Sequence, residues 1–168
     1  MGDVTPNPIL TGGLTGGCQC GAVRYAIGGV PDRVHLCHCR MCQKAVGGPF
    51  AAYAPVRREE LVWTRGAPAE FASSSVVKRL FCPACGTPLG FGYHERDRVG
   101  VTLGSLDRPE EVPPERHYGI ERRLGWLSRI DTLPSESTEA SMPAELARKL
   151  VSYQHPDHDT PADWSPPR

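Results

Sequence analysis

The seven cysteines of this 168-residue chain fall into three tight groups, and no other feature constrains the fold as strongly. Cysteines that only pack in a core are expected at scattered positions. Pairs two or three residues apart, followed by glycine, are typical of zinc knuckles, because a tight turn aims both thiolates at one point. The groups are Cys18-Gln19-Cys20-Gly21, Cys37-His38-Cys39-Arg40-Met41-Cys42 and Cys82-Pro83-Ala84-Cys85-Gly86.

The first and third groups together supply the ligands of one closed zinc site. Cys18, Cys20, Cys82 and Cys85 make a set of four thiolates, and structural zinc is held by four protein ligands. This site would connect a strand near the N-terminus to one about sixty residues later. The alternative is four buried apolar cysteines without a metal, but independent core residues have no reason to adopt knuckle spacing.

The remaining group, Cys37, Cys39 and Cys42, predicts a second zinc with one open position. Catalytic zinc has three protein ligands and a vacancy for water or substrate. We therefore expect two Zn²⁺ per chain, one structural and one catalytic. Two alternatives stay open: a Cys39–Cys42 disulfide acting as a redox switch, and a second closed structural site. The residues that could close that site are His35, His38 and His94.

The donor set of the second site indicates its substrate. Three thiolates give Zn²⁺ a formal charge of about −1 and make it a weak Lewis acid for activating water. A soft sulfur donor suits the vacancy better, and a coordinated thiol is deprotonated. We therefore expect a small thiol that is presented to an electrophile.

The secondary-structure pattern favours a mainly β, antiparallel fold. Gly and Pro supply 35 of the 168 residues, which indicates short elements joined by many turns. A short helix is expected from Arg40 to the Gly47-Gly48-Pro49 stop. Seven segments rich in β-branched or aromatic residues predict strands: Ala22–Ile27, Arg33–Leu36, Phe50–Ala54, Glu60–Thr64, Val76–Phe81, Leu89–Tyr93 and Arg98–Leu103.

Composition divides the chain into an N-terminal extension (1–13), a zinc-binding domain (14–134) and an acidic C-terminal extension (135–168). In the last part, a helix is expected near 144–153, with Leu146 and Leu150 docked on the core. The residues after it, including the His155–Asp159 tract, are expected to be mobile and solvated.

Charge and hydropathy exclude several functions. Lys plus Arg and Asp plus Glu each number 19, so nucleic acid and anionic membranes are not expected partners. The first residues lack the basic start and apolar stretch of a signal peptide, and no apolar run would span a bilayer. A cytoplasmic location is therefore expected, and a homodimer stays open.

Several motifs are shared with a known family. They are GGCQCGAVRY (16–25), CHCRMCQKAVGG (37–48), FCPACGTPLGF (81–91), GSLDRP (104–109), and the later His117, Trp126 and Asp131-Thr132-Leu133-Pro134. With these motifs the chain resembles the glutathione-dependent formaldehyde-activating enzyme family, which also includes centromere protein V.

The resemblance implies a compact, β-tent-like domain with the same division into structural and catalytic cysteines. It also implies a carbon–sulfur lyase that adds glutathione to formaldehyde. The alternative is a non-catalytic module with two structural zinc ions that docks a protein partner.

One position departs from the family pattern. Similar proteins often have Arg after the third cysteine of the central motif, where this chain has Gln43-Lys44. Arg24, Arg40 and Lys44 are the remaining candidate cations near an anionic thiol. The other interpretations are structural: His117 as a packed histidine, Trp126 as a core residue, and Lys78-Arg79 as the solvent-facing part of a strand.

Overall fold

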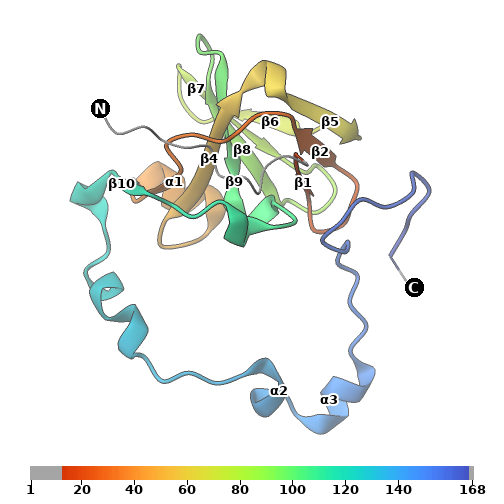
Figure 1. Cartoon of the computed structure of the whole chain (residues 1–168). Coiled ribbons are helices and arrows are strands. Elements are labelled where there is room, and N and C mark those ends of the chain that lie inside the picture. Colours follow the sequence, from red (N-terminus) through yellow and green to blue (C-terminus); the bar gives the residue numbers. More distant parts are fainter. Residues whose placement is uncertain (1–12, 167–168) are drawn as a thin grey trace.

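Two β-sheets form the body of the protein in the computed structural model, which describes residues 13–166 (Figure 1). The smaller sheet has the order β1-β2-β5, with β1 (Leu14–Gly17), β2 (Arg24–Ile27) and β5 (Leu61–Arg65). The larger sheet has the order β10-β3-β4-β9-β8-β7-β6. Its strands are β3 (His35–Cys37), β4 (Ala51–Arg57), β6 (Ala69–Ala72), β7 (Val77–Phe81), β8 (Pro88–Tyr93), β9 (Arg98–Thr102) and β10 (Arg116–Tyr118).

The predicted mainly antiparallel β fold is confirmed. Within the described residues every strand pair is antiparallel except β10 with β3. All seven predicted strands are present, with ends shifted by a few residues. The prediction missed β1, β6 and β10, because Leu-Thr-Gly-Gly, Ala-Glu-Phe-Ala and Arg-His-Tyr lack the β-branched enrichment that marks a strand. The expected N-terminal extension lies, apart from residue 13, outside the described residues.

The main core lies between the two sheets. On the larger sheet Val56 pairs with Val99, and Ala54 pairs with Val101, so four apolar side chains face inward together. Leu14, Tyr25 and Ile27 of the smaller sheet pack against them. The outer face of the larger sheet is therefore left for other contacts, and a second cluster forms there around Tyr53, Ala51 and Cys42.

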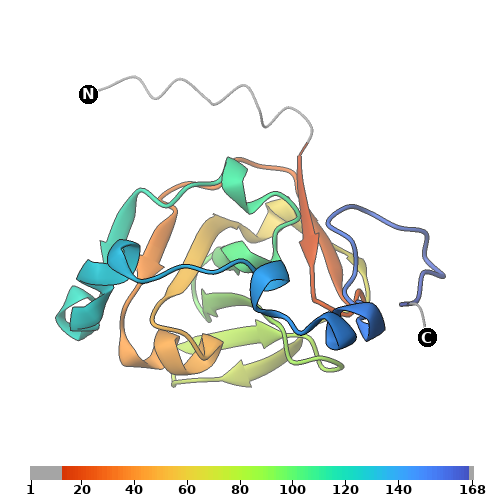
Figure 2. The ribbon, with the colours of Figure 1, turned by 90° about the horizontal axis from the view of Figure 1, so that it is seen from below.

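The helices are short and lie outside the sheets. Helix α1 (Arg40–Val46) begins and ends where the sequence predicted, because Gly47 adopts the left-handed conformation (φ 66°) that terminates a helix. Helices α2 (Thr138–Ser141) and α3 (Ala144–Lys149) lie in an arc that stands away from the body in Figure 1 and passes in front of the sheets in Figure 2. The 3-10 helices are η2 (Arg58–Glu60), η3 (Leu103–Ser105), η4 (Pro109–Glu111), η5 (Ile120–Arg122) and η6 (Gly125–Thr132).

Several side-chain predictions for the later part of the chain were wrong. Leu146 and Leu150 are 58% and 65% exposed, so α3 does not dock on the core through them. Trp126 is 47% exposed and is not a core residue. The side chains of Trp126, Leu146 and Leu150 are apolar, but they are not covered by any other part of the described chain. The sequence pattern alone could not show this.

The end of the chain returns to the body at His155, which was expected to be solvated, whereas Asp157, His158 and Asp159 are exposed as predicted. His155 is only 4% exposed, and its backbone N–H donates to the carbonyl of Gln19 over 2.7 Å. Its ring packs edge-on against Trp164, and Arg65 donates to the carbonyls of Thr160 and Pro161. We call residues 154–164 the C-terminal strap, because they lie against the turn that carries Cys18 and Cys20.

A buried ion pair joins β2 to the loop after η3. Arg24 donates from both terminal nitrogens to Asp107, over 2.7 and 2.6 Å, and the two side chains are 4% and 6% exposed. Thr15 also donates to Asp107 over 2.6 Å. Burial acts to raise the pKa of Asp107, but the hydrogen bonds from Arg24 and Thr15 hold it below its ordinary value. The Asp107 contribution to stability is thus present above pH about 4 and lost as pH falls through the lowered pKa.

We expect Asp107→Asn to lower the free energy of unfolding by about 3–5 kcal/mol, because it leaves a buried guanidinium without its main counterion. Urea unfolding of the zinc-loaded protein measures this. The matched control is Asp159→Asn, since Asp159 also contacts Arg24 but its side chain is 62% exposed. That change should cost less than about 1 kcal/mol. Equal losses from the two variants would contradict the assignment.

Candidate metal centres

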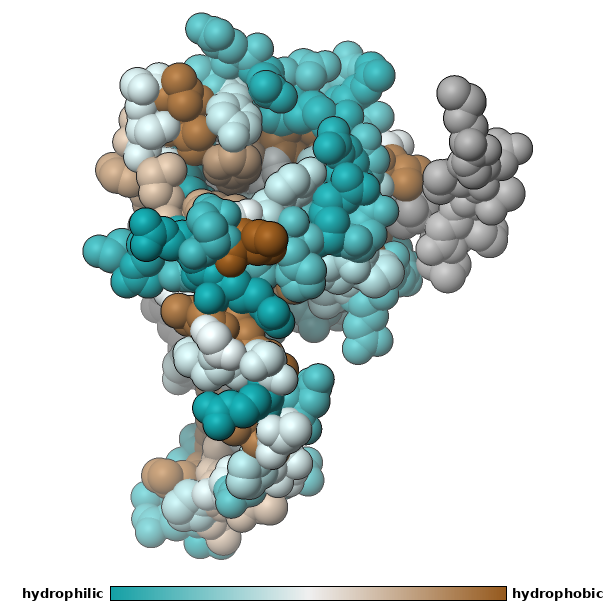
Figure 3. Space-filling model, turned by 90° about the vertical axis from the view of Figure 1, so that its left-hand side faces the viewer, coloured by the Kyte–Doolittle hydropathy of each residue, from teal (hydrophilic) through white to brown (hydrophobic). Residues whose placement is uncertain are grey.

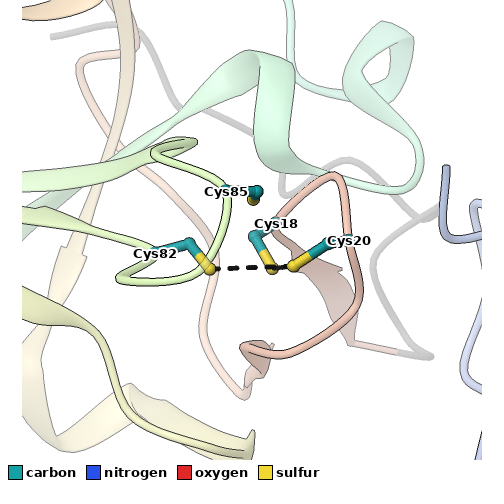
Figure 4. A group of neighbouring side chains, drawn as sticks. All are labelled: Cys18, Cys20, Cys82 and Cys85. Carbon is teal, nitrogen blue, oxygen red and sulfur yellow. Dashed lines mark hydrogen bonds between the residues drawn. The ribbon is translucent and has the colours of Figure 1, made fainter. Parts of the chain in front are cut away.

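The first and third cysteine groups meet where two turns face each other (Figure 4). Cys18 and Cys20 lie between β1 and β2, and Cys82 and Cys85 lie between β7 and β8. Their four sulfur atoms lie within 4.8 Å of one another. The Sγ of Cys20 is 3.6 Å from that of Cys18 and 3.9 Å from that of Cys82. Four sulfurs at about 2.3 Å from one zinc would be about 3.8 Å apart, so the arrangement fits a tetrahedral ion.

The backbone at these turns explains the convergence. Cys18 donates its N–H to the carbonyl of Val23, and Gly86 donates to the carbonyl of Cys82 over 2.9 Å. Gly86 has φ 76°, a conformation that other residues adopt at a cost. Each turn therefore closes on itself and directs its two thiols toward the opposite turn.

The four thiols of this group do not all ionise at neutral pH without a cation. Burial and the neighbouring thiols raise the pKa of Cys20 to about 12. Burial also acts to raise the pKa of Cys85, but hydrogen bonds from Thr87 lower it to about 6. Because Cys20 would otherwise stay protonated at neutral pH, holding four thiolates here requires a metal that displaces the proton.

The central group forms a second cluster on the outer face of the larger sheet. We call Cys37, Cys39 and Cys42 the cysteine trio. Cys37 ends β3, Cys39 caps the N-terminus of α1 and Cys42 lies in its first turn. The sulfur of Cys39 accepts the backbone N–H of Cys42 over 3.4 Å. The three sulfurs lie within 4.8 Å of one another, so they fit three corners of one coordination sphere.

No fourth ligand from residues 13–166 joins the trio. No other Cys, His, Asp or Glu in that range places a ligand atom within 4.8 Å of all three sulfurs. His38, 1% exposed, directs its Nε2 to the Nδ1 of His117 over 2.9 Å, and His35 directs its Nδ1 to the carbonyl of Arg33. His94 is exposed in the turn between β8 and β9. None of the three histidines that could have closed the site therefore supplies a fourth ligand atom.

Arg79 is the functional candidate that the sequence interpretation missed. It is 7% exposed, so the prediction of a solvent-facing residue was wrong. Its Nη2 donates to the sulfur of Cys42 over 3.5 Å, and its Nη1 donates to the hydroxyl of Tyr53 over 2.7 Å. A signal was available: neighbouring residues of a strand point to opposite faces, so Lys78 and Arg79 could not both face solvent if one face was covered.

Arg79 changes the electrostatics of the trio. The pKa of Cys42 is lowered to about 5, first by a hydrogen bond from Cys37 and then by Arg79, against the effect of burial. The pKa of Cys37 is raised by sharing that hydrogen bond and by burial. A guanidinium beside Cys42 thus supplies the positive charge that three thiolates around a divalent ion would leave unbalanced.

Two of the three cations considered from sequence, Arg24 and Arg40, have other partners. Arg24 is committed to Asp107, and Arg40 donates to the side chain of Gln43 over 3.0 Å. Gln43 is buried, and its side-chain amide donates to the carbonyls of His38 and Arg122. Gln43 therefore holds the backbone at His38 and Arg122 in place beside the trio. The positive charge next to Cys42 comes from Arg79.

None of the helices in the described part of the chain has the length and apolar character needed to cross a bilayer.

Comparisons with known proteins agree on one family. The family model described as glutathione-dependent formaldehyde-activating enzyme matches residues 13–122. A provisionally named glutathione-dependent formaldehyde-activating enzyme of Halomonas elongata is 28% identical over 142 residues, which are 79% of this chain and 90% of that protein.

Two further comparisons extend the likeness. An uncharacterized lyase of Schizosaccharomyces pombe is 31% identical over 78 residues, which are 46% of this chain and 56% of that protein. The chain thus spans a little over half of that relative. The crystal structure of a Rhodobacter sphaeroides protein matches this chain with a TM-score of 0.50 and 23% identity. The match covers 61% of this chain and 98% of the Rhodobacter sphaeroides chain. This structure shows a shared fold.

Proposed function

This chain belongs to the glutathione-dependent formaldehyde-activating enzyme family, and from that membership we propose that it adds a small thiol such as glutathione to formaldehyde or another small carbonyl compound, and reverses the addition. Family membership and the lyase name of one relative support an enzyme of the lyase kind. The carbon–sulfur lyase assignment and the substrates are part of the proposal.

One observation carries it: three converging cysteine sulfurs without a fourth ligand from residues 13–166. Three protein ligands are typical of a catalytic zinc site, and four are typical of a structural one. Under this proposal Cys18, Cys20, Cys82 and Cys85 hold the structural ion, and Cys37, Cys39 and Cys42 hold the catalytic one.

The reaction is an addition that needs no oxidant. When bound, zinc would lower the pKa of the incoming thiol and hold its sulfur as a thiolate. The sulfur forms a bond to the carbonyl carbon, the π electrons move to the oxygen, and the proton given up by the thiol ends on that oxygen. Arg79 offsets the negative charge that develops there, since it is a buried cation beside the trio.

The competing function is a module with two structural zinc ions that docks a protein partner. It requires a fourth protein ligand at the trio, and none of His35, His38 and His94 places a ring nitrogen within 4.8 Å of all three sulfurs. The geometry therefore favours the enzyme. A cytoplasmic location and a homodimer remain predictions.

Exchange NMR spectroscopy tests the activity directly. Glutathione and formaldehyde form S-hydroxymethylglutathione slowly without a catalyst, and the zinc-loaded protein should accelerate exchange between the free and adduct signals. The control is an equal concentration of zinc salt without protein. Exchange no faster than the control, with formaldehyde, glyoxylate and several small thiols, would overturn the proposal.

A further inference from the structure

A cavity of about 460 Å³ lies between α1 and the outer face of the sheet at β6, β7 and β8. Several apolar patches lie among hydrophilic residues on the side of the protein that carries α1 (Figure 3). Cavities of this size are typical of small-molecule sites, which are mostly apolar with a few polar groups. Apolar side chains dominate the wall, among them Met41, Ala45, Val46, Phe71, Leu80 and Phe81.

Within residues 13–166, two charged residues line the cavity, and both are basic. Lys44 and Arg79 lie in its wall, and no Asp or Glu of residues 13–166 does. A ligand of this cavity is therefore expected to combine an apolar body with an oxygen that accepts hydrogen bonds or carries negative charge.

Arg79 links the cavity to the trio. It lines the cavity and donates to Cys42, and Tyr53, which accepts from Arg79, lines the cavity as well. A guanidinium has five N–H groups, and within residues 13–166 Arg79 uses two of them. Its buried Nε has no partner in that range, and no carboxylate there forms an ion pair with it. Leaving a buried cation short of acceptors is costly unless a ligand supplies one.

We propose that this cavity holds the carbonyl substrate and selects an aldehyde with an apolar substituent, such as an aromatic ring, whose carbonyl oxygen accepts a hydrogen bond from Arg79. This inference rests on the proposed function and names its substrate class. The thiol sulfur bonds to the carbonyl carbon, the oxygen takes the π electrons beside Arg79, and the proton released by the thiol completes the hemithioacetal.

The size of the cavity argues against formaldehyde as the preferred substrate. One water occupies about 30 Å³, so the space holds on the order of fifteen waters. Formaldehyde is little larger than water and would leave most of the apolar wall wet. An aldehyde with a phenyl ring would expel that water, and the apolar surface removed from solvent favours its binding.

Binding is tested first without turnover. The probe is 3-phenylpropanamide, which has an apolar ring and a carbonyl oxygen but does not react with thiols. Added to the zinc-loaded protein, it should give saturable shifts of backbone amide signals in α1 and β7. Butylbenzene, which lacks the oxygen, should bind about tenfold more weakly. Arg79→Lys keeps the positive charge but loses the planar set of N–H donors. In this variant the preference for the amide over butylbenzene should be smaller.

Specificity is tested next. We expect kcat/KM for 3-phenylpropanal to exceed that for formaldehyde by about tenfold or more. Ala45→Phe fills the cavity from α1, so it should lower this ratio by a similar factor. The matched control is Ala147→Phe on α3, away from the cavity, which should keep the ratio.

The outcomes separate the two proposals. If the amide fails to bind while formaldehyde is still turned over, the cavity inference is wrong and the proposed function stands. If the amide binds and Ala45→Phe blocks it, but no aldehyde reacts, the ligand class of the cavity is supported and the proposed function fails. An unchanged aldehyde ratio in Ala45→Phe also overturns the inference.

Discussion

Cys82→Ser is expected to abolish the cooperative folded state. Cys82 is 0% exposed within the main core and belongs to the group that joins the β1–β2 turn to the β7–β8 turn. Structural zinc contributes apparent binding free energies of about 10–16 kcal/mol in small zinc-dependent peptides, whereas a whole domain is stable by only about 5–15 kcal/mol. The loss of one ligand should therefore remove the metal and with it most of the folding free energy.

The measurements are zinc content per chain and thermal unfolding followed by circular dichroism. The matched control is Cys42→Ser, because Cys42 is also buried, at 3% exposed, but belongs to the trio. That variant should lose one zinc and still unfold cooperatively. Two zinc ions and an unchanged melting temperature in Cys82→Ser would contradict the structural role of its site.

Cys39→Ser is expected to reduce thiol addition by more than about 100-fold while the protein stays folded. Removing a residue that only hydrogen-bonds to a metal ligand commonly lowers metal affinity or activity by about 10–100-fold. Cys39 is assigned as a direct ligand, so its loss should cost more. The fold should survive because Cys39 is the N-cap of α1, and serine is among the preferred N-cap residues.

Exchange NMR measures the loss of activity, and zinc analysis measures the occupancy of the second site. Cys39→Ala provides the comparison, since it removes both the ligand and the cap. It should be as inactive as the serine variant but less stable, by about 0.5–2 kcal/mol. Activity within a few-fold of the native protein in Cys39→Ser would show that the trio does not bind the thiol through a metal.

The sequence predicted what depends on local spacing. Glycine after each knuckle pair indicated turns, and the turns do bring Cys18 and Cys20 to Cys82 and Cys85. The ends of α1 followed from its flanking residues in the same way. Because these features are encoded within a few neighbouring residues, a single sequence suffices to predict them.

Other features depend on contacts between residues that are distant in sequence, so the sequence did not predict them. Arg79 of β7 donates to Cys42 of α1 only because α1 lies against the face of the larger sheet to which Arg79 points, and the two residues are 37 positions apart in the chain. The strap docks through His155 because Gly21, at φ 74°, leaves room: a Cβ there would lie 2.4 Å from the His155 ring. Strand alternation shows that Lys78 and Arg79 point to opposite faces of β7, but it does not show which residue Arg79 contacts. His155 carries no local pattern that distinguishes it from a surface position.

The assignment of one closed and one open site is tested most directly by ¹¹³Cd NMR of the cadmium-loaded protein, with and without glutathione. We predict two signals, one with the shift of four sulfur donors and one with the shift of three. Glutathione should move only the second signal, into the four-sulfur range, and Cys39→Ser should prevent that change. Two four-sulfur signals before the thiol is added, or a second signal that does not respond to it, would contradict the open site.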